Sequence, residues 1–134
     1  MIKYSKPYVK YKVMKAEDAV MKLLIIGSRS IKEYDFGEHI PAGVTMIISG
    51  GAGGIDTLAE KYADKKRLTK LIMRPRYDLY GRAAPLRRNE QMVELCDAVL
   101  AVWDGSSRGT KYTLDYAEKL GKRVILLLSD RKQG

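Results

Sequence analysis

The sequence has very few of the residues that build disulfide frameworks and common metal sites. Its 134 residues include one cysteine, Cys96, and one histidine, His39. A lone cysteine excludes a disulfide framework and a cysteine-cluster metal site. A lone histidine argues against histidine-based zinc sites and Ser-His-Asp triads. We therefore expect no metal centre, and we interpret both residues as structural.

Long apolar runs are also missing. No stretch approaches the roughly 20 apolar residues that a membrane-spanning helix needs. The lysines near the N-terminus are not followed by the apolar segment and cleavage site of a secretory signal. We therefore expect a cytoplasmic protein with no membrane partner. The chain is 46% hydrophobic and 31% charged, an ordinary globular mixture at a length that suits one domain.

The net charge of +9 is unevenly distributed along the chain. Residues 61–90 carry ten basic and three acidic side chains, whereas residues 21–60 carry three basic and five acidic ones. Such an excess favours anionic partners. The lysines of the basic block fit a solvated helix face. Its arginines Arg82, Arg87 and Arg88 flank a small-residue loop, where a guanidinium can bind a carboxylate or a phosphate with two hydrogen bonds.

Five short apolar runs alternate with segments of helical period. The runs occupy residues 21–26, 45–49, 71–73, 98–103 and 124–128. They do not alternate polar with apolar residues, which is typical of parallel strands buried on both faces. The pattern predicts an α/β fold, a three-layer Rossmann-like open parallel sheet of about five strands, within residues 21–130. With strand order 3-2-1-4-5, the first and fourth strands would be neighbours.

Residues 1–20 form an N-terminal extension to this domain. Val9, Tyr11 and Val13 alternate with two lysines, a pattern typical of a half-exposed edge strand. We expect this extension to add an edge strand to the sheet or to donate a strand to a second copy.

Three predicted strands end in loops of small residues, at 27–30 (GSRS), 49–56 (SGGAGGID) and 104–110 (DGSSRGT). Open parallel sheets bind ligands outside the carboxyl ends of their strands, where the strand order reverses. We therefore expect the three loops to meet over one crevice. Glycines let the backbone approach a phosphate, and helix N-termini supply N–H donors. The loops predict a site for a phosphate-bearing small molecule.

The candidate ligand-binding residues come from these loops and from the RRN element at 87–89. They are Gly27, Ser28, Arg29, Gly50, Gly51, Ala52, Gly53, Asp56, Arg88, Asn89, Asp104, Gly105, Ser106, Gly109 and Thr110. Neither the Walker pattern nor the dinucleotide fingerprint is met, which argues against ordinary NTPase or NAD chemistry. If the protein is an enzyme, Asp56 and Glu90 are its candidate catalytic acids.

Several candidates have a structural alternative. Arg29 can clamp a phosphate or form a salt bridge with Asp56 or Asp104. Asp56 can stabilise the dipole of its helix, or accept a hydrogen bond from a ribose hydroxyl or from Arg29. Asn89 and Thr110 can contact a ligand or cap the backbone.

Four motifs, in this order, are similar to a known superfamily: GSR at 27–29, SGGAGGID at 49–56, YGRAAPLRRNEQM at 80–92 and WDGSSRGTKYTLDYAEKLGKRV at 103–124. From about residue 21 to 128, the chain resembles the SLOG superfamily, and within it the small YspA-like and YpsA-related proteins. The resemblance implies a Rossmann-like fold and a nucleotide or nucleotide derivative as ligand. It identifies no further cofactor, and it implies a homo-oligomer, such as a dimer.

Two related branches imply alternative functions. The motifs also resemble the Rossmann-like domain of DNA-processing protein A, which implies binding of single-stranded DNA. The basic block would then follow the backbone, with Tyr62, Tyr77 and Tyr80 as its aromatic residues. The LOG "lysine decarboxylase-like" phosphoribohydrolases carry PGGxGTxxE, which implies a nucleotide N-glycoside hydrolase. In this chain the prolyl-glycyl start is absent and Thr113 stands at the acid position.

Overall fold

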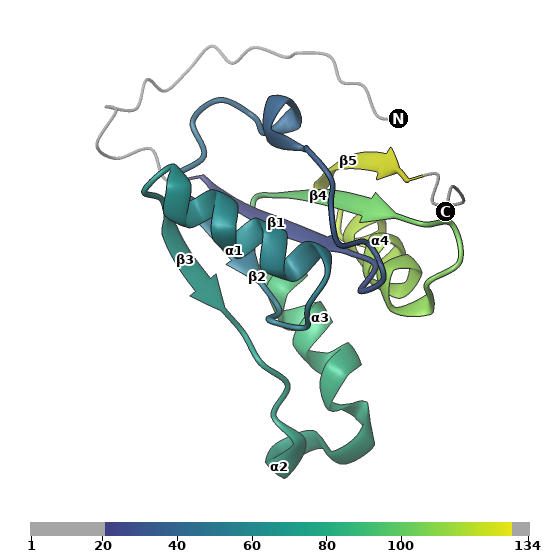
Figure 1. The fold of residues 1–134 in the computed structure, drawn as a ribbon. Coiled ribbons are helices and arrows are strands. Elements are labelled where there is room, and N and C mark those ends of the chain that lie inside the picture. The colour runs from purple at the N-terminus through teal and green to yellow at the C-terminus, as the bar shows by residue number, and fades with distance from the viewer. Residues whose placement is uncertain (1–20, 130–134) are drawn as a thin grey trace.

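The computed structural model describes residues 21–129, which fold around one parallel sheet of five strands (Figure 1). The strands are β1 (Lys22–Gly27), β2 (Met46–Ser49), β3 (Thr69–Ile72), β4 (Ala98–Trp103) and β5 (Arg123–Leu128). Their order is β3-β2-β1-β4-β5, so the three-layer α/β prediction and its strand order are confirmed. Residues 1–20, for which we expect an edge strand or an exchanged strand, lie outside the described residues.

Helices cover both faces of the sheet (Figure 1). They are α1 (Ile55–Lys65), α2 (Tyr77–Tyr80), α3 (Ala84–Leu95) and α4 (Arg108–Lys119), with short 3₁₀ turns η2 (Gly37–His39) and η3 (Gly81–Ala83). Helix α1 and the segment before β2 pack on one face, and α3 and α4 pack on the other. Within residues 21–129, no helix is long and apolar enough to cross a membrane.

The strand pattern explains the two cores. Leu23 and Ile25 of β1 face the core beneath α1, whereas Leu24 and Ile26 face the core beneath α3 and α4. A central strand with an apolar layer on each side needs an unbroken apolar run, as predicted. The prediction of burial on both faces is wrong for β5. Because β5 is an edge strand, Leu128 there is 66% exposed.

The order in which strands are added to the sheet reverses between β1 and β4, although the two strands run parallel. These neighbours pair in register from Leu23 opposite Ala98 to Gly27 opposite Val102. From β1 the sheet continues toward β2 and β3, and from β4 it continues the other way, toward β5. The chain that leaves β1 and the chain that leaves β4 lead to opposite faces of the sheet. A reversal of strand order of this kind is where open parallel sheets form a ligand-binding crevice.

Candidate functional site

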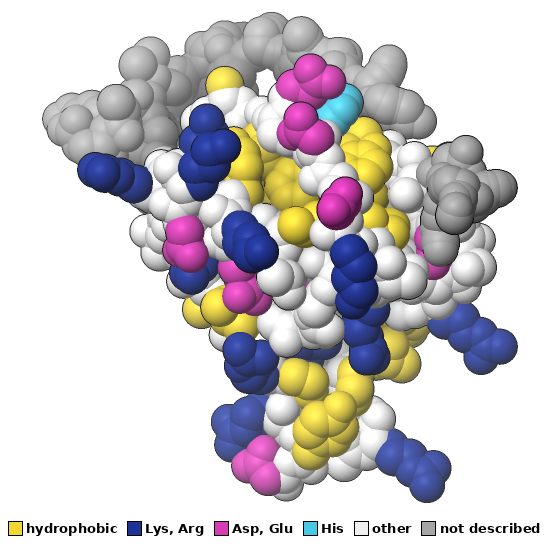
Figure 2. All heavy atoms as spheres, in the orientation of Figure 1, with side chains coloured by type: hydrophobic (Ala, Val, Ile, Leu, Met, Phe, Trp, Pro, Cys, Tyr) yellow, Lys and Arg dark blue, Asp and Glu magenta, His cyan; other side chains and the backbone are white. Residues whose placement is uncertain are grey.

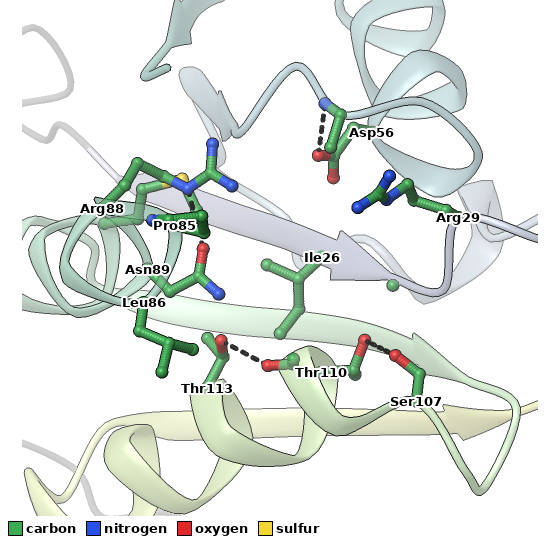
Figure 3. A pocket seen from close by; sticks show the side chains of 14 residues that line it. Ile26, Arg29, Asp56, Pro85, Leu86, Arg88, Asn89, Ser107, Thr110 and Thr113 are labelled. Atoms are coloured by element: carbon green, nitrogen blue, oxygen red, sulfur yellow. Dashed lines mark hydrogen bonds between the residues drawn. The ribbon is translucent and has the colours of Figure 1, made fainter. Parts of the chain in front are cut away.

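A cavity of about 240 Å³ lies at the carboxyl ends of β1 and β4 (Figure 3). Side chains and backbone from the β1 loop, the start of α1, the side of α3 and the start of α4 surround it. The lining residues are Ile26, Gly27, Arg29, Ala52, Asp56, Pro85, Leu86, Arg88, Asn89, Met92, Ser107, Gly109, Thr110 and Thr113.

More than half of the candidate residues line this cavity. They are Gly27, Arg29, Ala52, Asp56, Arg88, Asn89, Gly109 and Thr110. The others lie in the same loops without lining it: Ser28, Gly50, Gly51, Gly53, Asp104, Gly105 and Ser106. The fold thus brings the three small-residue loops and the RRN element to one place.

The start of α4 carries the free hydrogen-bond donors of the site. Helix α4 begins at Arg108, and its N-cap Ser107 makes no side-chain capping bond. The amides of Arg108, Gly109 and Thr110 donate to no acceptor among residues 21–129. Unpaired first-turn amides at the positive end of a helix are the donors that anions use.

The start of α1 is more nearly satisfied by its own loop. The amides of Asp56 and Thr57 donate to the carbonyls of Gly53 and Gly54 at 3.1 and 3.0 Å. The N-cap Gly54 has a φ of 57°, and a Cβ there would lie 2.5 Å from the carbonyl oxygen of Arg29. Glycine at this position therefore lets α1 begin against the backbone of the β1 loop.

Arg29 is a free cation beside the cavity. It is exposed, and in Figure 3 its guanidinium points toward the space beside Asp56. The salt bridges considered from the sequence do not form. Asp56 accepts a hydrogen bond from the amide of Ala52 at 2.9 Å, and Asp104 accepts from its own loop. Among residues 21–129, Arg29 has no hydrogen-bond or ion-pair partner.

Arg88 has a different role from Arg29, because it holds the loop at 49–56 in place. Its side chain is buried, and its Nη1 donates to the carbonyl oxygens of Gly50 at 2.7 Å and Met73 at 2.9 Å. Its Nε donates to Oδ1 of Asn89 at 2.8 Å. With these donors occupied, Arg88 is a positioning residue, and it fixes the amide of Asn89 at the cavity wall.

Asp104 and Ser106 of the third loop form hydrogen bonds that stabilise the conformation of the loop. Asp104 accepts hydrogen bonds from the amides of Ser106 at 2.9 Å and Ser107 at 2.8 Å, which lower the pKa of its carboxyl. The hydroxyl of Ser28 accepts from the amide of Asp104 at 3.2 Å. These bonds join the loops that follow β1 and β4, and they fix where α4 begins.

The two candidate catalytic acids lie in different surroundings. Within residues 21–129, Asp56 is the single carboxylate that lines the cavity. Glu90 lies outside it, where it accepts hydrogen bonds from the hydroxyl of Tyr112 and from Arg87 at 2.9 Å, and these bonds lower its pKa. Thr113, at the acid position of the hydrolase motif, lines the cavity and donates to the carbonyl of Gly109 at 2.9 Å.

The sequence did not predict the apolar part of the cavity lining. Ile26, Pro85, Leu86 and Met92 are the apolar side chains that line it. Helical spacing could have indicated two of them, Pro85 and Met92, because positions 85, 88, 89 and 92 share one face of α3. That face also packs on the sheet, so the pattern alone resembles an ordinary core face.

The buried carboxyl of Asp56 makes the stability of the protein depend on pH. Burial raises its pKa above the ordinary 3.8, and the amide of Ala52 and the charge of Arg88 offset part of this rise. A raised pKa means that the folded chain binds the proton more tightly than the unfolded chain. The stabilisation by this proton is complete below the unfolded pKa and is lost as pH rises through the folded pKa.

Asp56→Asn is therefore expected to gain stability relative to the wild type as pH rises from about 3.5 to 7. Urea unfolding across this range measures the difference in free energy of unfolding. Asp115→Asn is the control, because Asp115 is exposed and paired with Lys111 at 2.8 Å. If the free energy of unfolding of Asp56→Asn differed from that of the wild type by the same amount at every pH, the raised pKa of Asp56 would be contradicted.

Comparison with known proteins gives one relative. No family model matches the chain, and no solved structure matches it significantly. The Gene 61 protein of Mycobacterium phage D29 is 31% identical over 118 residues, which cover 78% of this chain and 94% of the phage protein. This identity extends over nearly the whole relative, and the chain belongs to the same family as the Gene 61 protein of Mycobacterium phage D29.

Proposed function

We propose that the protein binds a nucleotide or a nucleotide derivative through its phosphate at the start of α4. The observation that carries this proposal is the juxtaposition of the free amides at residues 108–110 with the unpaired guanidinium of Arg29 at one cavity. The amides supply directed donors, and Arg29 supplies a full positive charge. The resemblance to the SLOG superfamily supports the same class of ligand.

The rest of the cavity suits the remainder of a nucleotide. The apolar walls at Pro85 and Leu86 provide a surface for a base, and the Asn89 side chain lies beside them (Figure 3). An amide can both donate to and accept from the edge of a base. Asp56 lies across the cavity from α3, where its carboxylate can accept a hydrogen bond from a ribose hydroxyl.

A thermal-shift screen tests the proposal. The panel holds nucleoside 5′-monophosphates, cyclic nucleotides and ADP-ribose, each measured against its phosphate-free nucleoside. A ligand at 100 times its dissociation constant stabilises the folded protein by about 2.7 kcal/mol, so a binder raises the Tm by several degrees. We expect a rise with a phosphate-bearing compound and none with the nucleosides. No shift with any phosphate compound would count against the proposal.

The position of Asp56 also favours a second candidate function, hydrolysis of the N-glycosidic bond of a nucleotide. A buried carboxyl with a raised pKa beside a bound sugar can act as a general acid. Most glycoside hydrolases use two carboxylates, and in the described part of the chain Asp56 is the only one that lines this cavity. Chromatographic detection of free base from nucleoside monophosphates tests this function, and Asp56→Asn should abolish the release while leaving nucleotide binding in place.

A further inference from the structure

Strand β5 forms one edge of the sheet, and within residues 21–129 it pairs only with β4 (Figure 1). The backbone N–H and C=O groups on its outer side therefore have no strand partner in this part of the chain. Its sequence, RVILLL, holds one charged residue, Arg123, followed by five aliphatic ones. Edge strands are usually protected by lysine, by proline or by shortness, and β5 lacks this protection after its first residue.

The opposite edge of the sheet, β3, is protected in the usual way. It has four residues and begins with the exposed Thr69 and Lys70. Lys70 also forms a salt bridge with Asp64 at 2.9 Å. Of the two edges, β5 is the one that offers an apolar strand to another chain.

A groove runs beside β5, between that strand and α4. It begins in a hollow of about 460 Å³ with apolar walls at Trp103, Leu114, Val124 and Leu126. Val124 and Leu126 are two positions apart, so they point to the same face of the sheet, and Leu126 is 36% exposed. A second hollow of about 430 Å³ shares Trp103 with the first and continues the groove to Arg108.

The charged residues that line the groove leave one unpaired group at each end. Arg108 lies in the first turn of α4, and Glu118 lies in its last turn, shortly before β5 begins. Both side chains are exposed, and neither has a hydrogen-bond or ion-pair partner among residues 21–129. Between them, Lys111 and Asp115 form a salt bridge at 2.8 Å. Lys122 donates to two backbone carbonyls.

We propose that this groove binds an extended segment of another polypeptide, which adds a sixth strand to the sheet beside β5. The backbone of the segment pairs with the open edge, and its alternate side chains, which are apolar, fill the groove. The unpaired charges of the rim select an acidic residue at Arg108 and a basic residue at Glu118.

The size of the surface favours one strand over a second copy of the protein. Strand β5 has six residues, about 20 Å at 3.3 Å per residue, so the edge takes one segment of similar length. A stable dimer buries about 800 Å² per partner, from about 20 to 30 residues, and fewer residues line this groove. A small apolar molecule would fill the hollow but leave the backbone of β5 unpaired.

The groove goes beyond the proposed nucleotide site and does not depend on it. The nucleotide cavity is lined by Thr110 and Thr113 of α4, whereas the groove is lined by Lys111 and Leu114. Helix α4 therefore presents different faces to the two sites.

Tryptophan fluorescence of the full chain tests the proposal, because Trp103 is the sole tryptophan in the sequence. The probe is the heptapeptide KVTVTVE, blocked at both ends, which alternates apolar with polar side chains and carries opposite charges at its ends. We expect a saturable change in the emission of Trp103 with a Kd below about 1 mM. No saturable change up to about 1 mM peptide would overturn the proposal.

Methylation of the peptide backbone tests the addition of a strand. Two further probes carry N-methyl groups either on the valines or on the threonines. Successive N–H groups of a strand point to opposite sides, so only one of the two sets can donate to β5. We expect one methylated probe to lose binding and the other to retain it, and equal affinities would overturn the proposal.

Two variants of the protein test the groove itself. Leu126→Thr removes an apolar contact but keeps a side chain that suits a strand, and it should weaken binding at least about threefold. Its control is Leu79→Thr, which changes an exposed leucine outside the groove and should leave the affinity unchanged. Glu118→Lys should weaken KVTVTVE at least about twofold and strengthen the analogue EVTVTVE.

Melting curves establish that each variant is folded, and because Glu118 is exposed its variant keeps the test valid if Leu126→Thr is unstable. An unchanged preference between the two peptides in Glu118→Lys would contradict the proposal. So would equal peptide affinities of folded Leu126→Thr and Leu79→Thr.

Light scattering and one further variant test other occupants of the edge. A dimer that Leu126→Thr dissociates would assign the groove to a second copy of the chain. Peptide binding by Tyr11→Asp but not by the wild type would assign it to the extension at residues 1–20. Either result would overturn the proposal.

Discussion

Replacing Arg29 by glutamine is expected to weaken nucleotide binding at least about tenfold while leaving the Tm unchanged. A hydrogen bond to a charged group contributes about 1.5–3 kcal/mol, which corresponds to at least a tenfold change in affinity. Arg29 makes no hydrogen bond or salt bridge within residues 21–129, so its replacement removes neither from the folded protein. Isothermal titration calorimetry with the best nucleotide of the screen measures the loss.

Arg108→Gln is the matched control for this variant. Arg108 is exposed at the start of α4 and does not line the cavity. Only its backbone amide takes part in the proposed phosphate site. Removing this charge keeps the amide and should change the affinity only slightly. An Arg29→Gln protein that binds as tightly as Arg108→Gln would show that Arg29 does not contact the phosphate.

Replacing Gly54 by alanine is expected to destabilise the protein by about 3 kcal/mol or more. Two costs add at this residue. An alanine would be held at a positive φ of 57°, and its Cβ would lie 2.5 Å from the carbonyl oxygen of Arg29. Backbone strain of this kind costs about 1–3 kcal/mol, and forced overpacking costs a similar amount. Urea unfolding measures the change in free energy of unfolding.

Two other glycines, the adjacent Gly53 and Gly109 of α4, separate these costs. Gly53 also has a positive φ, of 100°, but a Cβ there meets nothing within 4 Å, so Gly53→Ala should show the strain alone. Gly109 lies in the first turn of α4 with open space around its Cβ position, and Gly109→Ala should not lower stability. Equal losses for Gly53→Ala and Gly54→Ala would contradict the close approach of α1 to the β1 loop.

Much of the fold was predictable because its central strands have simple patterns. Runs such as 98–103 are apolar at every position, and a parallel strand covered on both faces needs that pattern. The order of the strands placed the loops after β1 and β4 beside each other, and the glycines there marked close approach. The bounds of β3 were harder to predict from the sequence. The strand begins with Thr69 and Lys70, which are polar and exposed, and its apolar residues come only after them.

The roles of individual site residues were harder to predict. Arg29 and Arg88 are the same residue type near the same loops, yet one is exposed and unpaired while the other is buried and holds the carbonyls of Gly50 and Met73. Which guanidinium lies within hydrogen-bond distance of free carbonyls depends on the path of the backbone, and the sequence does not show that path. In the same way, Glu90 of α3 accepts a hydrogen bond from Tyr112 of α4. Because this contact depends on how the two helices pack, no local sequence pattern predicts it.

The net charge of +9 is likewise divided between different surfaces. The proposed phosphate site relies on amides and one free arginine, whereas most of the basic block lies along β3 and the residues at 74–82 that follow it (Figure 2). The total charge of the chain therefore does not identify the ligand of the site.

The most direct test of the account is an NMR titration of the ¹⁵N-labelled protein with a nucleoside 5′-monophosphate and with the matching nucleoside. We expect the monophosphate to shift the amide resonances of Arg108, Gly109 and Thr110 at concentrations where the nucleoside leaves them unchanged. We also expect Arg29→Gln to raise the concentration of monophosphate needed for these shifts. Amides at 108–110 that respond equally to nucleoside and monophosphate would contradict a phosphate site at the start of α4.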